Sequence, residues 1–517
     1  MSFPMAPFEL AHESDFKTIA IAIFVVFSAY KYFNARAQRA KLDAIPTLGP
    51  NGIFASYITV WKYMFYGREL IEEGCKEYPS AAFKIPTLFG WAVFLNSREM
   101  HEDFKRASEE ELSVLDQFEE TLQLRYTMSP VIHENPYHID VVRGALTRNI
   151  SARFDDVRDE LKAAFDEYIP PREEWVEVPN VIETIQNVVV RTSNRFFVGL
   201  PLCRNEDWCD LNLKFTINVL VNGSLINFFP KFLIPIAGRI ITNRKRSLRR
   251  AVKHLTPIFD ERFAMEREYG PDWPGKPNDL ISWLMDSCAQ TGEDWQKGSY
   301  EDLALRVISV NFVAILTTSQ TFVQALFHLA ANPQIVEPLR EEIRTTIERE
   351  GAWSKVAMVQ MRLLDSFLKE SHRHVGAQSI SMSRIARKDF TFSNGTVVPA
   401  GTSVGLPTLH IHRSEEAYPS PYSFNPTRFS ELREKEGEGI KHHMVTPTPD
   451  WLGFGAGKHA CPGRFFAVNE IKALIAHVVM TYDVKLKDTD VFPPEMYFAG
   501  FVSPNPKAKL LFRKREM

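Results

Sequence analysis

The sequence Phe454-Gly-Ala-Gly-Lys-His-Ala-Cys461-Pro-Gly463 places a single cysteine at the end of a glycine-rich loop. Glycines at positions 453, 455 and 457 allow the backbone to approach a flat or bulky group closely. A helical pattern of apolar residues follows from Arg464, so the cysteine lies near a predicted helix N-terminus. The helix dipole and the free backbone N–H groups there favour a thiolate, which is the form of cysteine that binds metals.

The isolation of this cysteine restricts the metal that it can bind. Zinc and iron–sulfur sites need several cysteine or histidine ligands, whereas the next cysteine in the chain is Cys288. A haem iron needs only one axial thiolate. The pattern therefore favours haem, and the alternative at this stage is a buried structural cysteine beside a glycine turn.

The composition of the chain excludes several classes of protein. The 517 residues are 45% hydrophobic and 24% charged, which excludes disorder or coiled coil for the bulk of the chain. With 61 basic and 64 acidic residues, no nucleic-acid partner is expected. Five cysteines in so long a chain do not form a disulfide framework, so we expect a reducing compartment.

The N-terminal segment predicts a membrane anchor at about residues 16–33. Phe16 to Phe33 is an apolar stretch of 18 residues with Lys17 and Lys31 near its ends, and a span needs roughly 17 to 25 residues. The alternatives are a buried core helix and a cleaved signal peptide. Basic residues follow the stretch, which predicts a luminal N-terminus and a cytosolic remainder. We therefore expect an anchor segment at 1–44 and one catalytic domain at 45–517.

The remaining pattern predicts a mainly helical fold with small β-sheets. We expect a short helix at 68–78, strands at 81–86 and 91–96, and a hairpin turn at Asn394-Gly395. A helix of about 32 residues is predicted from Ser299, where Asp302 completes a capping pattern, to Asn332. The stretch from Val307 to Ala331 carries no formal charge, but nine polar residues in it favour a buried helix that lines a pocket over a second membrane span: Ser309, Asn311, Thr317, Thr318, Ser319, Gln320, Thr321, Gln324 and His328.

The cysteine loop resembles the signature F-x-x-G-x-x-x-C-x-G of the cytochrome P-450 haem-thiolate family. Phe454, Gly457, Cys461 and Gly463 match every fixed position, and His459 stands where the family usually has Arg or His. The resemblance covers essentially the whole chain. It implies the cytochrome P-450 fold and haem b with Cys461 as the axial ligand of the iron.

Two further motifs match the family in the same order. Glu370-Ser-His-Arg373 matches E-x-x-R, and the i, i+3 spacing places both side chains on one helix face. Taken alone, such a pair is most often an exposed salt bridge. Arg428 resembles the arginine of the family's P-E-R-F region and would join Glu370 and Arg373 in a structural network. The family's glutamate is Thr427 in this chain.

On the long helix, Val313-Ala-Ile-Leu-Thr-Thr318 falls where the family has A/G-G-x-D/E-T-T. The resemblance places Ala314 at the small position beside the oxygen site and makes Thr317 the catalytic alcohol, which holds a water and relays protons. The usual acidic residue is Leu316, which puts the acid–alcohol pair in doubt. The alternative is a helix-interior threonine bonded to the i−4 carbonyl.

The resemblance also implies three haem-propionate partners. Arg384 follows the E-x-x-R helix as the family's propionate arginine does, and His459 lies two residues before the cysteine. Arg143 corresponds to the arginine of the family's W-x-x-x-R, although Ile139 replaces the tryptophan. An exposed arginine is the equally good alternative for Arg143.

The function implied by the resemblance is monooxygenation. We expect electrons from an NADPH-cytochrome reductase, a lipophilic small-molecule substrate and a single-pass location in the endoplasmic reticulum membrane. The stretch 314–319 looks most like fungal ent-kaurene oxidase-like enzymes, which implies a terpenoid substrate in secondary metabolism. The alternatives are a haem-thiolate isomerase or dehydratase, and a non-catalytic membrane carrier of haem or sterol. The apolar stretch Phe228 to Pro235 is a candidate contact with the bilayer.

Overall fold

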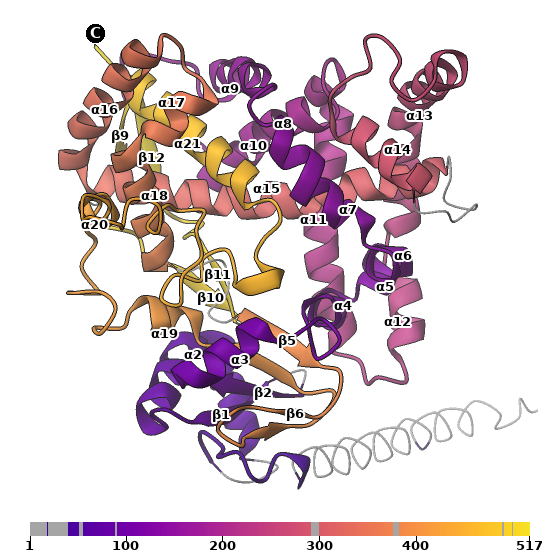
Figure 1. Cartoon of the computed structure of the whole chain (residues 1–517), viewed down its shortest axis with the longest axis vertical. Coiled ribbons are helices and arrows are strands. Elements are labelled where there is room, and N and C mark those ends of the chain that lie inside the picture. Colours follow the sequence, from indigo (N-terminus) through magenta and orange to yellow (C-terminus); the bar gives the residue numbers. More distant parts are fainter. Residues whose placement is uncertain are drawn as a thin grey trace, which may run out of the picture.

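The computed structural model describes residue 18 and residues 40–50, 55–87, 90–290, 299–375, 382–488, 491–498 and 500–516. The predicted membrane anchor at 16–33 lies outside the described residues, except for Thr18. The described chain is mainly helical with small sheets, as predicted, and the long helix α15 crosses the middle of the molecule (Figure 1).

The helices occupy most of the chain between the first and last sheets. They are α2 (Ser56–Glu77), α3 (Arg98–Arg106), α4 (Val114–Leu122), α5 (Leu124–Thr127), α6 (Pro130–Glu134), α7 (Tyr137–Val141), the π-helix η1 (Val142–Leu146), α8 (Thr147–Asn149), α9 (Phe154–Tyr168), α10 (Val181–Phe197), η2 (Leu202–Arg204), α11 (Glu206–Asn227), α12 (Ile234–Ile241), α13 (Arg244–Tyr269), α14 (Leu280–Gln290), α15 (Tyr300–Ala331), η3 (Pro333–Ile335), α16 (Val336–Glu350), α17 (Lys355–Gln360), α18 (Arg362–Val375), α19 (Thr408–His412), α20 (Arg428–Arg433), η4 (Gly457–His459) and α21 (Arg464–Thr481).

The largest sheet has the strand order β1-β2-β8-β5-β3, in which only the β2–β8 pair is parallel. The other sheets are β4-β12-β9, β10-β11 and β6-β7. The strand bounds are β1 (Ala82–Thr87), β2 (Gly90–Leu95), β3 (Leu112–Ser113), β4 (Val176–Glu177), β5 (Met382–Ala386), β6 (Phe390–Thr391), β7 (Val397–Val398), β8 (Ser403–Leu406), β9 (Tyr482–Leu486), β10 (Met496–Phe498), β11 (Phe501–Ser503) and β12 (Leu510–Lys514). The predicted first two strands and the hairpin around Gly395 are confirmed, and Gly395 has a φ of 83°.

Helix α15 has the predicted bounds and supports both halves of the core. Its N-terminus is capped by the Ser299 hydroxyl, which accepts a hydrogen bond from the Asp302 N–H. Within the described part of the chain it is the one helix long and apolar enough to cross a membrane, but most of it is buried inside the protein. Its first half packs with α7, α11, α13 and α14, and its second half with α9, α10, α18 and α21.

The helix predicted at 68–78 is longer than expected. It begins at Ser56, and its first three turns carry exposed aromatic and aliphatic side chains such as Trp61. Tyr66 interrupts the helical backbone with φ −131° and ψ 35°. The apolar residues before this break point away from the core, so the sequence lacked the amphipathic pattern that marks a helix.

Candidate active site

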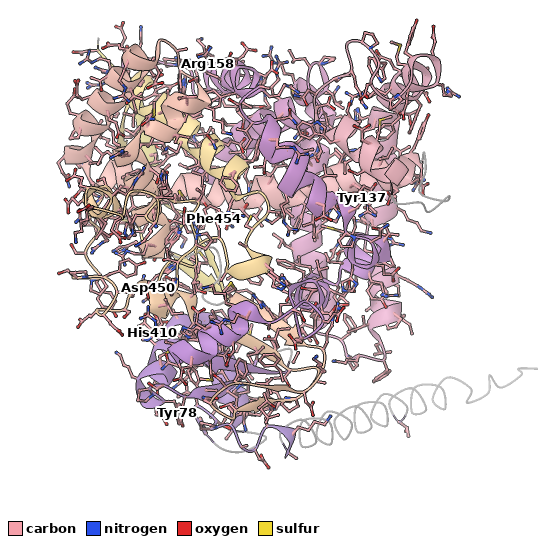
Figure 2. All side chains as sticks on the ribbon, viewed as in Figure 1. Tyr78, Tyr137, Arg158, His410, Asp450 and Phe454 are labelled. Carbon is pink, nitrogen blue, oxygen red and sulfur yellow. The ribbon has the colours of Figure 1, made fainter. Side chains whose placement is uncertain are left out.

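The loop from Phe454 to Gly463 is tightly folded, packs Phe454 against His372 of α18 and leads into α21. The Cys461 N–H donates to the Phe454 carbonyl over 2.8 Å, which closes the loop. Gly455 and Gly457 have φ values of 77° and 63°, where residues with a side chain are strained. Figure 2 labels Phe454 near the centre of the molecule. The loop thus holds the cysteine sulfur at a fixed place in the interior.

The Cys461 sulfur lies at the N-terminus of α21, as the sequence predicted. Burial raises the pKa of the Cys461 thiol, while the backbone N–H groups of Gly463 and Arg464 and the charge of Arg464 lower it. Burial has the larger effect, so the helix terminus alone does not make the sulfur a thiolate. A bound metal cation would supply the missing stabilisation, because a thiol that coordinates a metal is deprotonated. This donor set, one sulfur with backbone N–H groups, fits the axial position of a haem iron.

Two side chains near this loop, Arg384 and His459, have buried nitrogen atoms without a partner in the described chain. The Arg384 guanidinium, on β5, donates to the Phe104 carbonyl, but its Nε and one Nη find no acceptor. Burial lowers the pKa of Arg384 to about 10. The His459 Nδ1 lies 3.3 Å from a Glu109 oxygen, and its Nε2 is also unpaired. The buried N–H groups of Arg384 require an acceptor, and the carboxylates of haem propionates fit them. His459 supplies a further donor when its imidazole is protonated on Nε2.

Arg143 lies on η1 and is the third of the predicted propionate partners. Burial lowers the pKa of His459, and the charges of Arg384 and Arg143 lower it further, so both arginines are near the imidazole. The Arg143 guanidinium is about half-exposed and lies 3.2 Å from Asp140. The structure therefore places all three predicted propionate partners together, although Ile139 replaces the expected tryptophan.

The E-x-x-R pair forms the predicted network and is fully buried. Two nitrogens of Arg373 donate to the two oxygens of Glu370 over 2.7 and 2.8 Å. The remaining nitrogen of Arg373 donates to the carbonyls of His412 and Pro421. The exposed salt bridge that sequence reasoning kept as an alternative is wrong for this pair, because neither side chain is accessible.

Arg428 joins Glu370 from the start of α20. Its Nε lies 3.1 and 3.2 Å from the two carboxylate oxygens, and its other nitrogens donate to the carbonyls of Pro419, Ser420 and Ser423. The Thr427 hydroxyl bonds Asn425 Oδ1 and a Glu431 oxygen, so it takes no part in the network. The network therefore ties α18 to the segment that precedes the cysteine loop.

The open face of α15 carries the residues predicted for the oxygen site. Val313 is 55% exposed although the helix is mostly buried, and Ala314, Leu316 and Thr317 are partly accessible beside it. The Thr317 hydroxyl donates to the Val313 carbonyl over 2.8 Å, which is the i−4 bond considered above. Thr318 is buried instead. The accessible alcohol of this pair is therefore Thr317.

Sequence reasoning missed two groups in this region. The Arg464 guanidinium donates to the carbonyls of Cys461 and Val445 and holds the end of the loop in place. The sequence feature that could have identified Arg464 is its position directly after Gly463, the last fixed residue of the cysteine motif. Glu109 contacts His459 from a segment about 350 residues away, and no sequence pattern connects the two.

Comparison with known proteins agrees with this geometry. The sequence model of the cytochrome P450 family matches residues 92–512. The chain is 40% identical over 480 residues to cytochrome P450 monooxygenase 151 of Postia placenta, which covers 93% of this chain and 95% of the relative. It is 38% identical to monooxygenase 103 of the same fungus, over 95% of this chain and 97% of the relative. A cytochrome P450 monooxygenase of Ganoderma lucidum is 31% identical over 98% of each chain.

A helical fold around a cysteine at a helix N-terminus, with nitrogens of Arg384 and His459 left unpaired among the described residues, is the arrangement expected of a haem-thiolate protein. The chain belongs to the cytochrome P450 family. It is a haem b monooxygenase that binds the haem through a cysteine thiolate.

Proposed function

We propose that this chain is a membrane-bound monooxygenase that oxidises a terpenoid or similar lipophilic metabolite of a fungal biosynthetic pathway, with Cys461 as the axial ligand. The observation that carries the site assignment is the position of Cys461 at the N-terminus of α21, beside the unpaired donors of Arg384 and His459. The other four cysteines, Cys75, Cys203, Cys209 and Cys288, are buried in the core.

When bound, the haem supplies the redox centre at which dioxygen is activated with two electrons from a reductase. Arg384, His459 and Arg143 would hold its propionates. Glu370, Arg373 and Arg428 fix the segment that leads to the cysteine loop, and Phe454 closes that loop. These roles rest on the hydrogen bonds and unpaired donors described above.

Thr317 positions a water in the oxygen site and passes protons to the reacting oxygen. Its hydroxyl hydrogen bonds Val313, so the hydroxyl oxygen is oriented to accept from a water on the accessible face of α15. Leu316 next to it has no ionisable group that could donate a proton. The proton therefore reaches Thr317 through water rather than through a neighbouring carboxylate.

Replacing Thr317 by alanine tests this role. The variant should keep its haem and its substrate affinity but form less product per NADPH consumed, with the difference released as hydrogen peroxide. Thr318→Ala is the matched control, because that side chain is buried, and should remain coupled. Full coupling in Thr317→Ala together with uncoupling in Thr318→Ala would transfer the role to Thr318.

The substrate side of α15 supports a lipophilic substrate. Val313 and Leu316 present apolar surface on the accessible face, and Phe312 lies beside them. The relatives named above are monooxygenases from fungi. Their names give no substrate, so the terpenoid class rests on the resemblance of residues 314–319.

An NADPH-cytochrome reductase is the proposed electron donor, and the endoplasmic reticulum membrane the proposed location. Lys458 is exposed on the cysteine loop, where an electron donor could approach. Exposed apolar side chains on α2, such as Trp61, and before α12, such as Phe232, support contact with a bilayer. Both helices lie in the lower half of Figure 1.

The decisive experiment is a carbon monoxide difference spectrum of reduced protein, followed by product analysis in a host that supplies reductase and candidate terpenes. Cys461→Ala should abolish the thiolate spectrum, whereas Cys288→Ala should retain it. A thiolate spectrum in Cys461→Ala would refute the ligand assignment. Substrate-dependent oxygen use with other lipophilic molecules but none of the terpenes would refute the terpenoid class.

A further inference from the structure

A small cavity lies where the second half of α15 meets α18 and the strand β11. Its volume of about 10 Å³ leaves room for one water molecule. From α15 it is lined by Gln320, Thr321 and Gln324, and from α18 by Ser371 and His372. A small cavity with polar partners holds water, whereas a cavity lined only by apolar side chains stays dry. The polar lining therefore makes water the natural occupant of this cavity.

Two residues of this lining have polar atoms without a partner in the described chain. Gln324 and His372 are 4% and 5% exposed, and Gln324 Oε1 and both ring nitrogens of His372 form no hydrogen bond there. Burial lowers the pKa of His372 to about 4, so the imidazole is neutral at physiological pH, with one nitrogen that donates and one that accepts. A water between the two side chains can donate to Gln324 Oε1 and accept from the imidazole N–H. One water would therefore satisfy both residues.

The cavity continues the face of α15 that carries Thr317. The three lining residues of α15 follow Thr317 by three, four and seven positions, so all of them share its face of the helix. The Thr321 hydroxyl donates to the Thr317 carbonyl over 2.9 Å, so the Thr321 oxygen can accept from water. Thr321 lies one helical turn, about 5 Å along the axis, beyond Thr317. The cavity is thus adjacent to the position of the proposed catalytic alcohol.

We propose that this cavity holds an ordered water, oriented by His372 and Gln324, that supplies protons to Thr317 in place of the carboxylate that Leu316 replaces. The proposal rests on the role of Thr317 proposed above. In each transfer the water gives a proton to the next oxygen and regains one from solvent, so one O–H bond breaks for each that forms. His372 and Gln324 are positioning residues, since the neutral imidazole and the amide orient the water and release no proton themselves.

The first test measures coupling in the haem-loaded, full-length chain. His372→Leu and Gln324→Leu each remove one partner of the water and should reduce the product formed per NADPH about threefold, with the difference released as hydrogen peroxide. His372→Gln keeps both a donor and an acceptor at this position, so it should restore the coupling of the parent. Failure of His372→Gln to do so, with its haem retained, would overturn the proposal.

The matched control is His477→Leu on α21. Burial lowers the pKa of His477 to about 4 as well, and its Nε2 has no partner in the part of the chain that the structure describes. Its ring packs against Phe165 and Tyr482 and does not line the cavity. His477→Leu should therefore remain as coupled as the parent, and a threefold loss of coupling in this variant would overturn the assignment to His372.

The second test detects the water site without turnover. If one water joins His372 and Gln324, the losses in the free energy of unfolding caused by His372→Leu and Gln324→Leu should sum to more than the loss in the double variant. The pair Gln324→Leu and His477→Leu should be additive, because those two side chains share no partner. Urea unfolding of the haem-loaded proteins measures both cycles, and additivity in the first cycle would overturn the water site.

Thr317→Ala separates failure of the relay from failure of the proposed function. Loss of coupling in Thr317→Ala, with full coupling in both His372→Leu and Gln324→Leu, would refute the relay alone. Full coupling in Thr317→Ala would refute the role proposed for Thr317 and the relay with it.

Discussion

Glu370 on α18 and Glu470 on α21 are both buried glutamates, but their surroundings shift their pKa values in opposite directions. Burial would raise the pKa of Glu370, but Arg373, the Asn425 N–H and Arg428 together hold it below the usual range. Among the described residues, the Glu470 carboxylate accepts hydrogen bonds only from the hydroxyls of Thr192 and Ser193, and burial raises its pKa to about 7. Burial is common to both, so the nearby guanidinium groups decide which carboxylate is charged.

Removing a cation from the Glu370 network should have the largest effect. Arg373→Ala leaves Glu370 with Arg428 as its only cation and frees the carbonyls of His412 and Pro421. We expect a loss of about 3–5 kcal/mol in stability and failure to retain haem. Haem content per chain and the urea midpoint of the purified protein measure both effects.

The control for this variant is an exposed pair with the same i, i+3 spacing. Arg344→Ala removes contacts to Glu341 and Glu348 on the surface of α16 and should change stability by less than about 1 kcal/mol. A soluble, fully haem-loaded Arg373→Ala protein with the stability of Arg344→Ala would show that Glu370 does not need its arginine.

Glu470 should respond to pH in the opposite direction from a paired carboxylate. Its folded pKa of about 7 lies above an unfolded value near 4.3, so its contribution is fully favourable below the unfolded pKa and is lost as the pH rises through 7. Glu470→Gln removes this dependence. The stability of the variant relative to the parent should therefore increase by roughly 3 kcal/mol between pH 4.5 and pH 8.5.

Urea unfolding at several pH values measures this difference. A surface control, Glu348→Gln, should follow the parent at each pH because its side chain is exposed. A parent whose stability remains constant between pH 5 and 8.5 would mean that a cation or a water network stabilises ionised Glu470.

The contrast also explains what could be predicted from the sequence. Cys461, Glu370, Arg373 and Arg428 were found because each has a fixed spacing within a short motif, and the polar residues on α15 marked a buried helix. Arg143 was less clear, because Ile139 obscures its motif and only the fold places it near His459. Glu470 carried no signal at all, since its environment is made by α10, almost 280 residues earlier in the chain.

The same reasoning explains the errors at the surface. The first half of α2 was missed because its apolar residues face outward, so they do not follow the helical spacing of residues that pack against a core.

The thiolate expected at Cys461 was attributed to the helix dipole, but burial has the larger effect on its pKa. A helix terminus can be recognised from sequence, whereas the depth at which the fold buries it cannot.

The smallest effect is expected for Arg428→Lys, which keeps the charge of the network but removes its geometry. A lysine ammonium is a single point of donation, so it cannot contact Glu370 and also reach the carbonyls of Pro419 and Ser423, as the guanidinium does. Glu370 keeps both bonds from Arg373, so it should remain ionised and the loss should be about 1–2 kcal/mol. The variant should bind haem but release it faster, because the 419–425 segment is held less tightly. Haem transfer to apomyoglobin gives this rate. An Arg428→Lys protein that retains no haem, as expected for Arg373→Ala, would show that the carbonyl contacts, rather than the neutralisation of Glu370, hold the network together.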